Sequence, residues 1–287
     1  MRLIAFGIAA LALLAAQARA DEIVLRADPQ PIVDVTINGN AARLLVDPGL
    51  PDVIVFDPGA EARFGIRRMP FAAEVGLDDA SIRARIARPS VRFANGKSSR
   101  AFAGLFGARW MELPGIDGAL GPGVLPFDDI RIVLRDGAGG AVRQFALKNP
   151  DVWQIPTTLG AEPVSVTFGL RREESMLNRS AASLLSERGL FTPSGDVRPT
   201  LFFLGLRTTT HPGLVSERVL GRSMGETLAR TAAPLSGATG DVDVIVVRPP
   251  SDAPPRYGAT LGRAALADCF EISVSRRTKK LSLRCAD

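Results

Sequence analysis

The apolar residues of this chain come mostly in short runs, and turn-forming residues separate one run from the next. The sequence holds 28 glycines and 21 prolines, and both are spread along its length. Such a pattern is typical of a protein built from many short β-strands. Sustained helical periodicity is limited to residues 58–64 and 180–188. We therefore predict an all-β protein with a few short helices.

The clearest hairpin signal lies near the start of this pattern. Residues 31–37 and 42–46 both alternate between apolar and polar positions, and Asn38-Gly39 stands between them. Asn-Gly is the preferred pair for a tight turn between two antiparallel strands. The second of these predicted strands ends at Asp47, which places a carboxylate at the end of the hairpin.

A second strand and a short helix follow this carboxylate. Pro48-Gly49 predicts a turn, and residues 52–56 resume as a strand. Asp57 and Pro58 are suited to the N-cap and first position of a helix, and Gly65 to the residue that ends it. The predicted order is strand, acidic turn, strand and short helix.

The first twenty residues have the features of a secretory signal peptide. Arg2 is followed by an uncharged apolar run over residues 3–16, and Ala18-Arg19-Ala20 is a small-x-small cleavage signal before Asp21. A membrane anchor is the alternative, but the run is shorter than the roughly 18 to 20 apolar residues that a span requires. We expect residues 1–20 to be removed, no stable membrane anchor, and a mature protein that is exported to the periplasm or secreted.

Net charge argues against a nucleic-acid partner. The formal charge is +5, and removal of Arg2 and Arg19 from the 35 basic residues leaves an excess of three over the 30 acidic ones. The remaining basic residues are scattered, and aromatic residues make up only 6% of the chain. Nucleic-acid binding requires a clustered basic face with stacking partners, so we expect none.

The two cysteines predict a disulfide. Residues 269–275 and 280–285 both alternate, and the polar segment between them is suited to a turn. A hairpin centred near Arg277 places Cys269 opposite Cys285, residue 271 opposite 283, and residue 273 opposite 281. Closing such a loop contributes about 3 kcal/mol in the chain-entropy model. A metal-binding thiol has little support, because there is no Cys-x-x-Cys pair and His211 is the only histidine. We expect neither a metal nor a cofactor.

Residues 31–66, PIVDVTINGNAARLLVDPGLPDVIVFDPGAEARFGI, resemble the opening of a bacterial retropepsin-like or pepsin-like aspartic peptidase domain. In that family a hairpin leads into Asp-Thr-Gly and then a short helix. Residues 116–125 and 130–134 are similar to the closing part of the same domain, so the resemblance covers about residues 31–135. It implies an all-β, two-lobed architecture of β-barrels with short helices.

The second half of the chain repeats this order weakly. Thr167-Phe168-Gly169 corresponds to Asp47-Pro48-Gly49, and residues 259–266 correspond to residues 118–125. We expect a signal peptide over 1–20, an N-terminal peptidase-like lobe over 21–140, a connection over 141–162, and a degenerate C-terminal lobe over 163–287.

The chemistry depends on what the two loops supply. Aspartic proteolysis uses two carboxylates that share one proton, one acting as base on a water and the other as acid. Asp47 is the candidate catalytic residue, but Thr167 at the matching place has no comparable ionisation. In the family a hydroxyl after each Asp also ties the two loops together, and Pro48 and Phe168 have none. The motif therefore argues against a working pair.

The resemblance also implies a flap, a hairpin that covers the ligand. Residues 72–82 fit such a hairpin, with its tip at Gly76, Leu77, Asp78 and Asp79. Asp78 and Asp79 are candidate ligand contacts, but a solvated turn is the favoured explanation for them.

Two functions are consistent with these features. The preferred one is a monomeric, non-catalytic pseudo-peptidase that binds an extended peptide or a partner protein between its lobes, since strand addition needs only backbone donors and side-chain pockets. The alternative is a divergent aspartic endopeptidase, an aspartic-type hydrolase in which Asp47 activates water.

Overall fold

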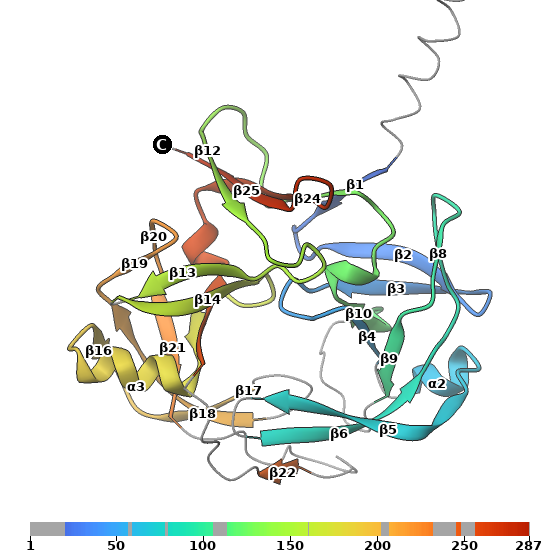
Figure 1. Ribbon diagram of the computed structural model, residues 1–287, viewed down its shortest axis with the longest axis horizontal. Helices are drawn as coiled ribbons and strands as arrows, with labels where there is room; N and C mark the ends of the chain where they lie inside the picture. Colours follow the sequence, from blue (N-terminus) through green and yellow to red (C-terminus); the bar gives the residue numbers. More distant parts are fainter. Residues whose placement is uncertain are drawn as a thin grey trace, which may run out of the picture.

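The computed structural model describes residues 21–56, 59–77, 80–105, 114–159, 161–201, 207–231, 245–247 and 256–286 (Figure 1). The predicted signal peptide lies outside these residues. The described chain is mostly β-strand, which confirms the all-β prediction. Its helices are short: α2 (Ala60–Arg63), α3 (Arg179–Glu187), and the 3-10 helices η2 (Pro122–Val124) and η3 (Ala264–Leu266). No helix in these ranges is long and apolar enough to cross a membrane.

The first half of the chain builds most of a ten-stranded sheet. Its order is β22-β6-β9-β4-β10-β3-β2-β7-β8, and β5 pairs with β6 outside this path. The strands are β2 (Ile32–Ile37), β3 (Asn40–Val46), β4 (Val53–Phe56), β5 (Arg68–Leu77), β6 (Ala80–Ala87), β7 (Val91–Phe93), β8 (Ser98–Ser99), β9 (Phe102–Leu105), β10 (Gly118–Leu120) and β22 (Ile245–Val247). The hairpin at Asn38-Gly39 forms as predicted, with Ile37 opposite Asn40.

The second half builds an eight-stranded sheet of order β13-β14-β23-β15-β21-β18-β16, with β17 paired to β18. The strands are β13 (Ile155–Leu159), β14 (Glu162–Gly169), β15 (Ser175–Leu177), β16 (Phe191–Pro193), β17 (Arg198–Leu201), β18 (Arg207–Val215), β21 (Glu226–Arg230) and β23 (Tyr257–Gly262); β19 (Arg218–Val219) and β20 (Arg222–Ser223) pair separately. Because β13 pairs with β14, this half begins near Ile155, whereas the sequence predicted a boundary at 163.

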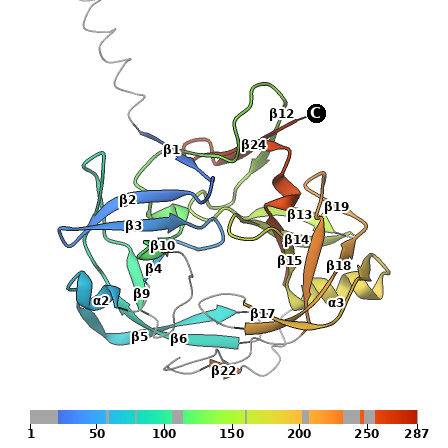
Figure 2. The same ribbon diagram turned by 180° about the vertical axis from the view of Figure 1, so that it is seen from behind.

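The two large sheets repeat one topology, and Figure 2 shows them on opposite sides of the molecule. In each sheet, the strand next to the second arm of a hairpin runs parallel to that arm: β10 lies beside β3, and β23 lies beside β14. The next strands then follow in the same order: β4, β9 and β6 in the first sheet, and β15, β21 and β18 in the second. The repeat that the sequence suggested is therefore present as a repeat of strand order.

Equivalent residues form the core of each half. Leu44, Val46 and Leu120 are fully buried in the first half, as are Val166, Phe168 and Leu261 in the second. Alternation along the strands puts these side chains on one face of each sheet. Full burial of one such side chain contributes about 1.5 to 3 kcal/mol, so the repeated triad is a substantial part of each core.

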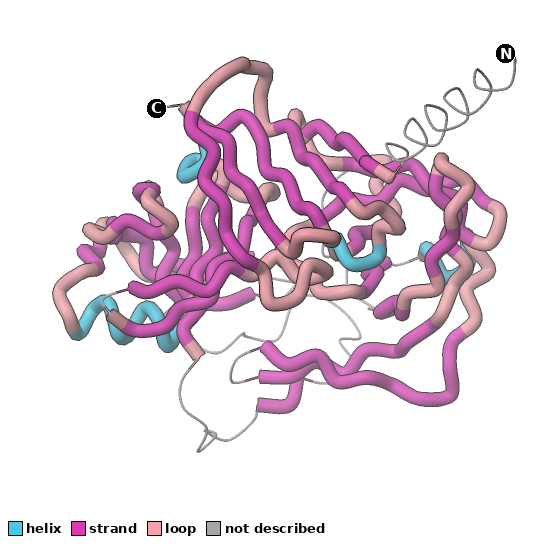
Figure 3. Tube along the Cα trace, turned by 45° about the horizontal axis from the view of Figure 1, so that its top comes forward, coloured by secondary structure: helices cyan, strands magenta, loops and turns pink. Residues whose placement is uncertain are grey.

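A third sheet of five strands joins the two halves (Figure 3). Its order is β1-β11-β24-β25-β12, and its strands are β1 (Glu22–Arg26), β11 (Asp129–Val133), β12 (Ala141–Ala146), β24 (Cys269–Ser275) and β25 (Lys280–Cys285). We refer to it as the joining sheet. Since β11 comes from the first half and β24 from the second, their antiparallel pairing holds the halves together.

The predicted disulfide forms in the joining sheet, with Cys269 opposite Cys285 and an S–S distance of 2.04 Å. The predicted register beyond it is wrong by one residue. A β-bulge at Phe270 makes Glu271 pair with Arg284 rather than with residue 283, and Ser273 pair with Ser282 rather than with residue 281. The extra residue of the bulge compensates for a four-residue turn at 276–279.

Both predicted helices are present and end in the same way. Asn178 caps α3 by accepting a hydrogen bond from the Ala181 N–H at 2.9 Å. For α2 the N-cap is Gly59, and the predicted Asp57 and Pro58 lie outside the described residues. Gly65 and Gly189 follow the two helices with φ of 57° and 66°, a left-handed conformation that favours glycine.

Candidate functional site

Asp47 follows directly on β3 and is held in a tight loop. Its N–H donates to the carbonyl of Leu120 at 2.9 Å, and its own carbonyl accepts from the Leu50 N–H at 3.0 Å. The side chain turns back, so that Oδ1 accepts from the Gly49 N–H at 3.0 Å. With its side chain only 8% exposed, this carboxylate needs a compensating partner.

That partner is Arg171, which comes from the second half of the chain. Its Nε lies 3.1 Å from Asp47 Oδ2, and 24% of its side chain is exposed. Arg171 lies two residues after the end of β14, and Asp47 lies directly after the end of β3. A carboxylate of one half is therefore neutralised by a guanidinium of the other.

A glycine at the end of the neighbouring strand shapes each of these loops: Gly121 directly follows β10, and Gly262 is the last residue of β23. A Cβ at Gly121 would lie 1.6 Å from the carbonyl oxygen of Pro51, and a Cβ at Gly262 would lie 2.3 Å from that of Glu174. Real Cβ atoms do not approach a carbonyl oxygen so closely. The backbone of each loop can therefore rest on the neighbouring strand only because a glycine is present there.

Strand pairing identifies the counterpart of Asp47 in the second half. Leu120 pairs with Val46, and Leu261 pairs with Phe168, so the next residue of each hairpin arm is Asp47 in one half and Gly169 in the other. The sequence comparison had matched Asp47 with Thr167, two residues earlier. Matching of the letters aligns Gly169 with Gly49, whereas the strand register aligns Gly169 with Asp47.

Thr167 lies within the second sheet. It is opposite Thr260, and the two hydroxyl oxygens are 3.1 Å apart. Phe168 is fully buried in the core, and Gly169 is the last residue of β14. The predicted triplet thus supplies a structural hydrogen bond and a core side chain, while the side chain that reaches Asp47 belongs to the following loop.

A second guanidinium lies near the same carboxylate. Burial lowers the pKa of Arg172 from its ordinary value, and the positive charge of Arg171 lowers it further. Glu174 and, to a smaller extent, Asp47 act in the opposite direction. Arg172 is therefore within electrostatic reach of Asp47, and the loop after β14 brings positive charge to the place where this carboxylate lies.

The outer charges of this loop are engaged elsewhere. Glu173 forms an ion pair with Arg263, and Glu174 lies 3.9 Å from Arg198. The backbone is also fixed, because the Arg263 N–H donates to the Arg172 carbonyl at 2.7 Å. These contacts hold the loop so that Arg171 projects towards Asp47.

The chemistry of this arrangement differs from that of a shared-proton pair. A general base needs an oxygen free to accept a proton from water. Here one oxygen of Asp47 accepts from Gly49 and the other lies against Arg171. Gly169, at the matching place in the second half, contributes no second acid. The contacts are those of an ion pair that joins two halves.

Another carboxylate pair lies close to this loop. The pKa of Asp52 is raised, chiefly by burial and then by the like charge of Asp151, while Arg276 opposes the shift. Arg276 Nε lies 3.0 Å from Asp151 Oδ1, and its other nitrogens donate to the carbonyls of Pro122 and Phe127, each at 2.8 Å. Arg276 thereby connects the turn of the β24–β25 hairpin to the segment around η2.

The hairpin predicted for residues 72–82 is present as far as the described backbone extends. Strands β5 and β6 form a hairpin in which Gly76 pairs with Ser81 and Leu77 pairs with Ala80. Asp78 and Asp79, the predicted tip, lie outside the described residues. The hairpin also pairs with β22, a strand from the second half that the sequence did not predict.

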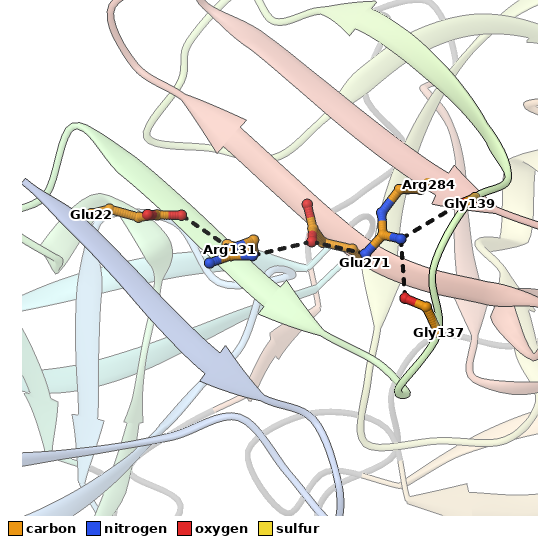
Figure 4. A network of polar contacts seen from close by, with 6 residues as sticks. All are labelled: Glu22, Arg131, Gly137, Gly139, Glu271 and Arg284. Atoms are coloured by element: carbon orange, nitrogen blue, oxygen red, sulfur yellow. Dashed lines mark hydrogen bonds and ion pairs between the residues drawn. The ribbon is translucent and has the colours of Figure 1, made fainter. Parts of the chain in front are cut away.

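The joining sheet carries a second polar feature on its outer face (Figure 4). Arg131 lies 3.0 Å from Glu22 and 3.7 Å from Glu271, and Glu271 lies 3.3 Å from Arg284. Alternating charges thus cross four neighbouring strands. Beside them Ser273 and Ser282 line a polar hollow of about 730 Å³.

The disulfide, with Cys269 fully buried, is compatible with an oxidising location such as an exported protein occupies. Among the described residues, no group of three or more His, Cys, Asp or Glu side chains is arranged to hold a metal ion.

The fold and the site define an all-β protein with a duplicated sheet and a buried ion pair between its halves. No known family model matches this sequence, and no curated protein matches it at a significant level.

Proposed function

We propose that this chain is a non-catalytic relative of the retropepsin-like and pepsin-like aspartic peptidases. In this proposal the two halves are the two lobes, and an extended peptide or a segment of a partner protein binds between them. The repeated strand order, the paired hairpins and the position of Asp47 at the end of β3 support the family assignment. The fold by itself does not establish whether the protein is an enzyme, because fold does not determine function.

The ion pair between Asp47 and Arg171 carries the proposal. An aspartic peptidase requires two carboxylates at this position, and here Gly169 and Arg171 stand in for the second one. The guanidinium group of an arginine does not give up its proton in proteins, so it cannot act as a general acid near neutral pH. Peptide binding does not need the carboxylate pair, since a β-strand ligand is held by backbone hydrogen bonds and side-chain pockets.

One experiment tests both binding and cleavage. The purified protein is incubated with a pool of random-sequence synthetic peptides from acidic to neutral pH, and mass spectrometry identifies peptides that are retained and any new peptide ends. We expect retention of a subset of peptides without cleavage. The controls are Asp47→Asn, and Asp34→Asn at a carboxylate whose side chain is 85% exposed on β2.

Cleavage that persists in Asp34→Asn and is lost in Asp47→Asn would overturn the proposal in favour of a divergent endopeptidase. Retention of no peptide under any condition would also overturn it. Export is tested separately by sequencing the N-terminus of the purified protein, for which we expect residue 21.

A further inference from the structure

Strand β6 has two neighbours along one of its edges. Its other edge is paired with β5 along the hairpin, from Ala72 opposite Arg85 to Leu77 opposite Ala80. On the first edge, residues 85–87 pair with β9, and residues 80–82 pair with β22. Figure 1 shows β22 beside the part of β6 that extends away from the first half. We call residues 80–84 the distal edge of β6.

The strand that covers this edge belongs to the second half of the chain. In sequence, β22 lies between β21 and β23, which both belong to the second sheet. The connection that contains it runs from 231 to 256, whereas the corresponding connection of the first half, between β9 and β10, runs only from 106 to 117. The added length is what allows a second-half strand to reach the first sheet.

Without β22 the distal edge would present unpaired backbone groups. An open strand edge is a template on which another extended segment adds, with its N–H and C=O groups completing the ladder. The pairing of Val246 with Ser81 and of Val247 with Ala80 is of this kind and is antiparallel. In its backbone contacts, β22 therefore occupies the edge as an added peptide would.

The contact is also short enough to be exchanged. It comprises the three register pairs that end at Ile245 opposite Ile82. Each hydrogen bond of such a ladder makes only a modest net contribution to stability, so three register pairs give β22 a small advantage over an open edge. A longer peptide that also pairs with residues 83 and 84 would form a more extensive ladder.

We propose that the distal edge of β6 is the docking edge for the extended ligand, and that β22 is an internal competitor for it. The inference rests on the proposed peptide-binding function and adds where the ligand pairs and what holds it back. A ligand adds antiparallel to residues 80–84 and displaces β22. The apparent affinity for the ligand equals the intrinsic affinity multiplied by the fraction of molecules in which β22 has left the distal edge.

A disulfide between the two strands tests the competition. Directly opposed antiparallel residues have Cα atoms about 4.5 to 5.5 Å apart, which is within the range of a disulfide. The double variant Ser81→Cys/Val246→Cys is oxidised and compared with each single variant in the peptide-retention assay. We expect the cross-linked protein to bind at least about tenfold more weakly than the single variants. Equal binding, or failure of the pair to oxidise, would overturn the inference.

The opposite variant releases the edge. Replacing Ile245, Val246 and Val247 with Gly-Pro-Gly removes strand-forming residues from β22 and leaves the sequence of β6 intact. We expect about tenfold tighter peptide retention, with slower amide hydrogen exchange at residues 80–84 when peptide is bound. Tighter binding without protection of these amides would place the ligand elsewhere and overturn the inference.

The two proposals fail in different ways. If wild type and the single-cysteine variants retain peptides but neither the cross-link nor the release changes retention, the inference about β22 fails and the proposed function stands. If no variant retains any peptide, including the released one, the proposed function itself fails. Far-UV circular dichroism and urea unfolding of each variant establish that it is folded.

Discussion

The ion pair between Asp47 and Arg171 should stabilise the contact between the two halves measurably. At 3.1 Å its gross attraction is about 5 kcal/mol for an effective dielectric constant near 20, and desolvation offsets part of this. Exposed pairs contribute about 0.2 to 1 kcal/mol, and losing one partner of a fully buried pair costs about 3 to 5 kcal/mol. The side chains of Asp47 and Arg171 are 8% and 24% exposed, so this pair lies between the exposed and the fully buried cases. We expect a coupling energy of about 1.5 to 3 kcal/mol.

A double-mutant cycle measures this quantity. The variants Asp47→Asn, Arg171→Gln and the double variant are unfolded in urea alongside wild type, at low and at high salt. Asparagine keeps an oxygen that can accept from the Gly49 N–H, so the cycle reports mainly on the charge. Salt should reduce the coupling only slightly, because the pair is largely buried.

The control cycle uses Arg26 and Asp136, which are 2.8 Å apart with side chains 59% and 83% exposed. Its coupling should stay below about 1 kcal/mol and fall with salt. If the Asp47–Arg171 coupling is no larger than this control, the pair does not hold the halves together and the reasoning is refuted.

Three further predictions concern stability. Burial and the charge of Asp151 raise the pKa of Asp52, so the folded protein binds this proton more tightly than the unfolded chain, and ionisation at higher pH costs stability. Asp52→Asn should therefore raise the urea midpoint at neutral pH, and this gain should vanish below the ordinary carboxyl pKa of 3.8. A lowered midpoint at neutral pH would contradict this. Gly121→Ala should destabilise the protein by about 3 kcal/mol through the clash of its Cβ with Pro51. Gly49→Ala should cost less, because the nearest atom to its new Cβ is Asp47 Oδ1 at 3.3 Å. Equal effects of the two variants in thermal unfolding would be inconsistent with the packing. Replacing Cys269 and Cys285 together with serine should cost about 3 kcal/mol, and non-reducing mass spectrometry of wild type that finds two free thiols would refute the pairing.

Local signals predicted the parts of this fold that depend on near neighbours. The Asn38-Gly39 turn and the Gly65 helix end each depend on residues close in sequence, and each is present. The cysteine pair was predictable because both residues end strands of one hairpin.

Features that depend on distant residues were not predictable from local pattern. The bulge at Phe270 forms where Arg135 and Arg284 pack on its ring at 4.6 and 5.4 Å, and Arg135 is far away in sequence. Arg171 meets Asp47 only after both sheets have formed, and nothing in the periodicity of either segment marks the contact. The run Arg171-Arg172-Glu173-Glu174 directly after a strand was the one available signal.

The joining sheet brings together residues 22–26 and 269–285, which are separated by nearly the whole chain. While β24 is still missing, β11 has β1 on one side and an open edge on the other, and the buried faces of Ile130 and Ile132 lack part of their cover. Contacts of such long sequence separation form late, and open edges are prone to aggregate. During synthesis, the first half must therefore wait with an unprotected edge until the last strands arrive, and a chain shortened before residue 269 should need a chaperone to remain in solution.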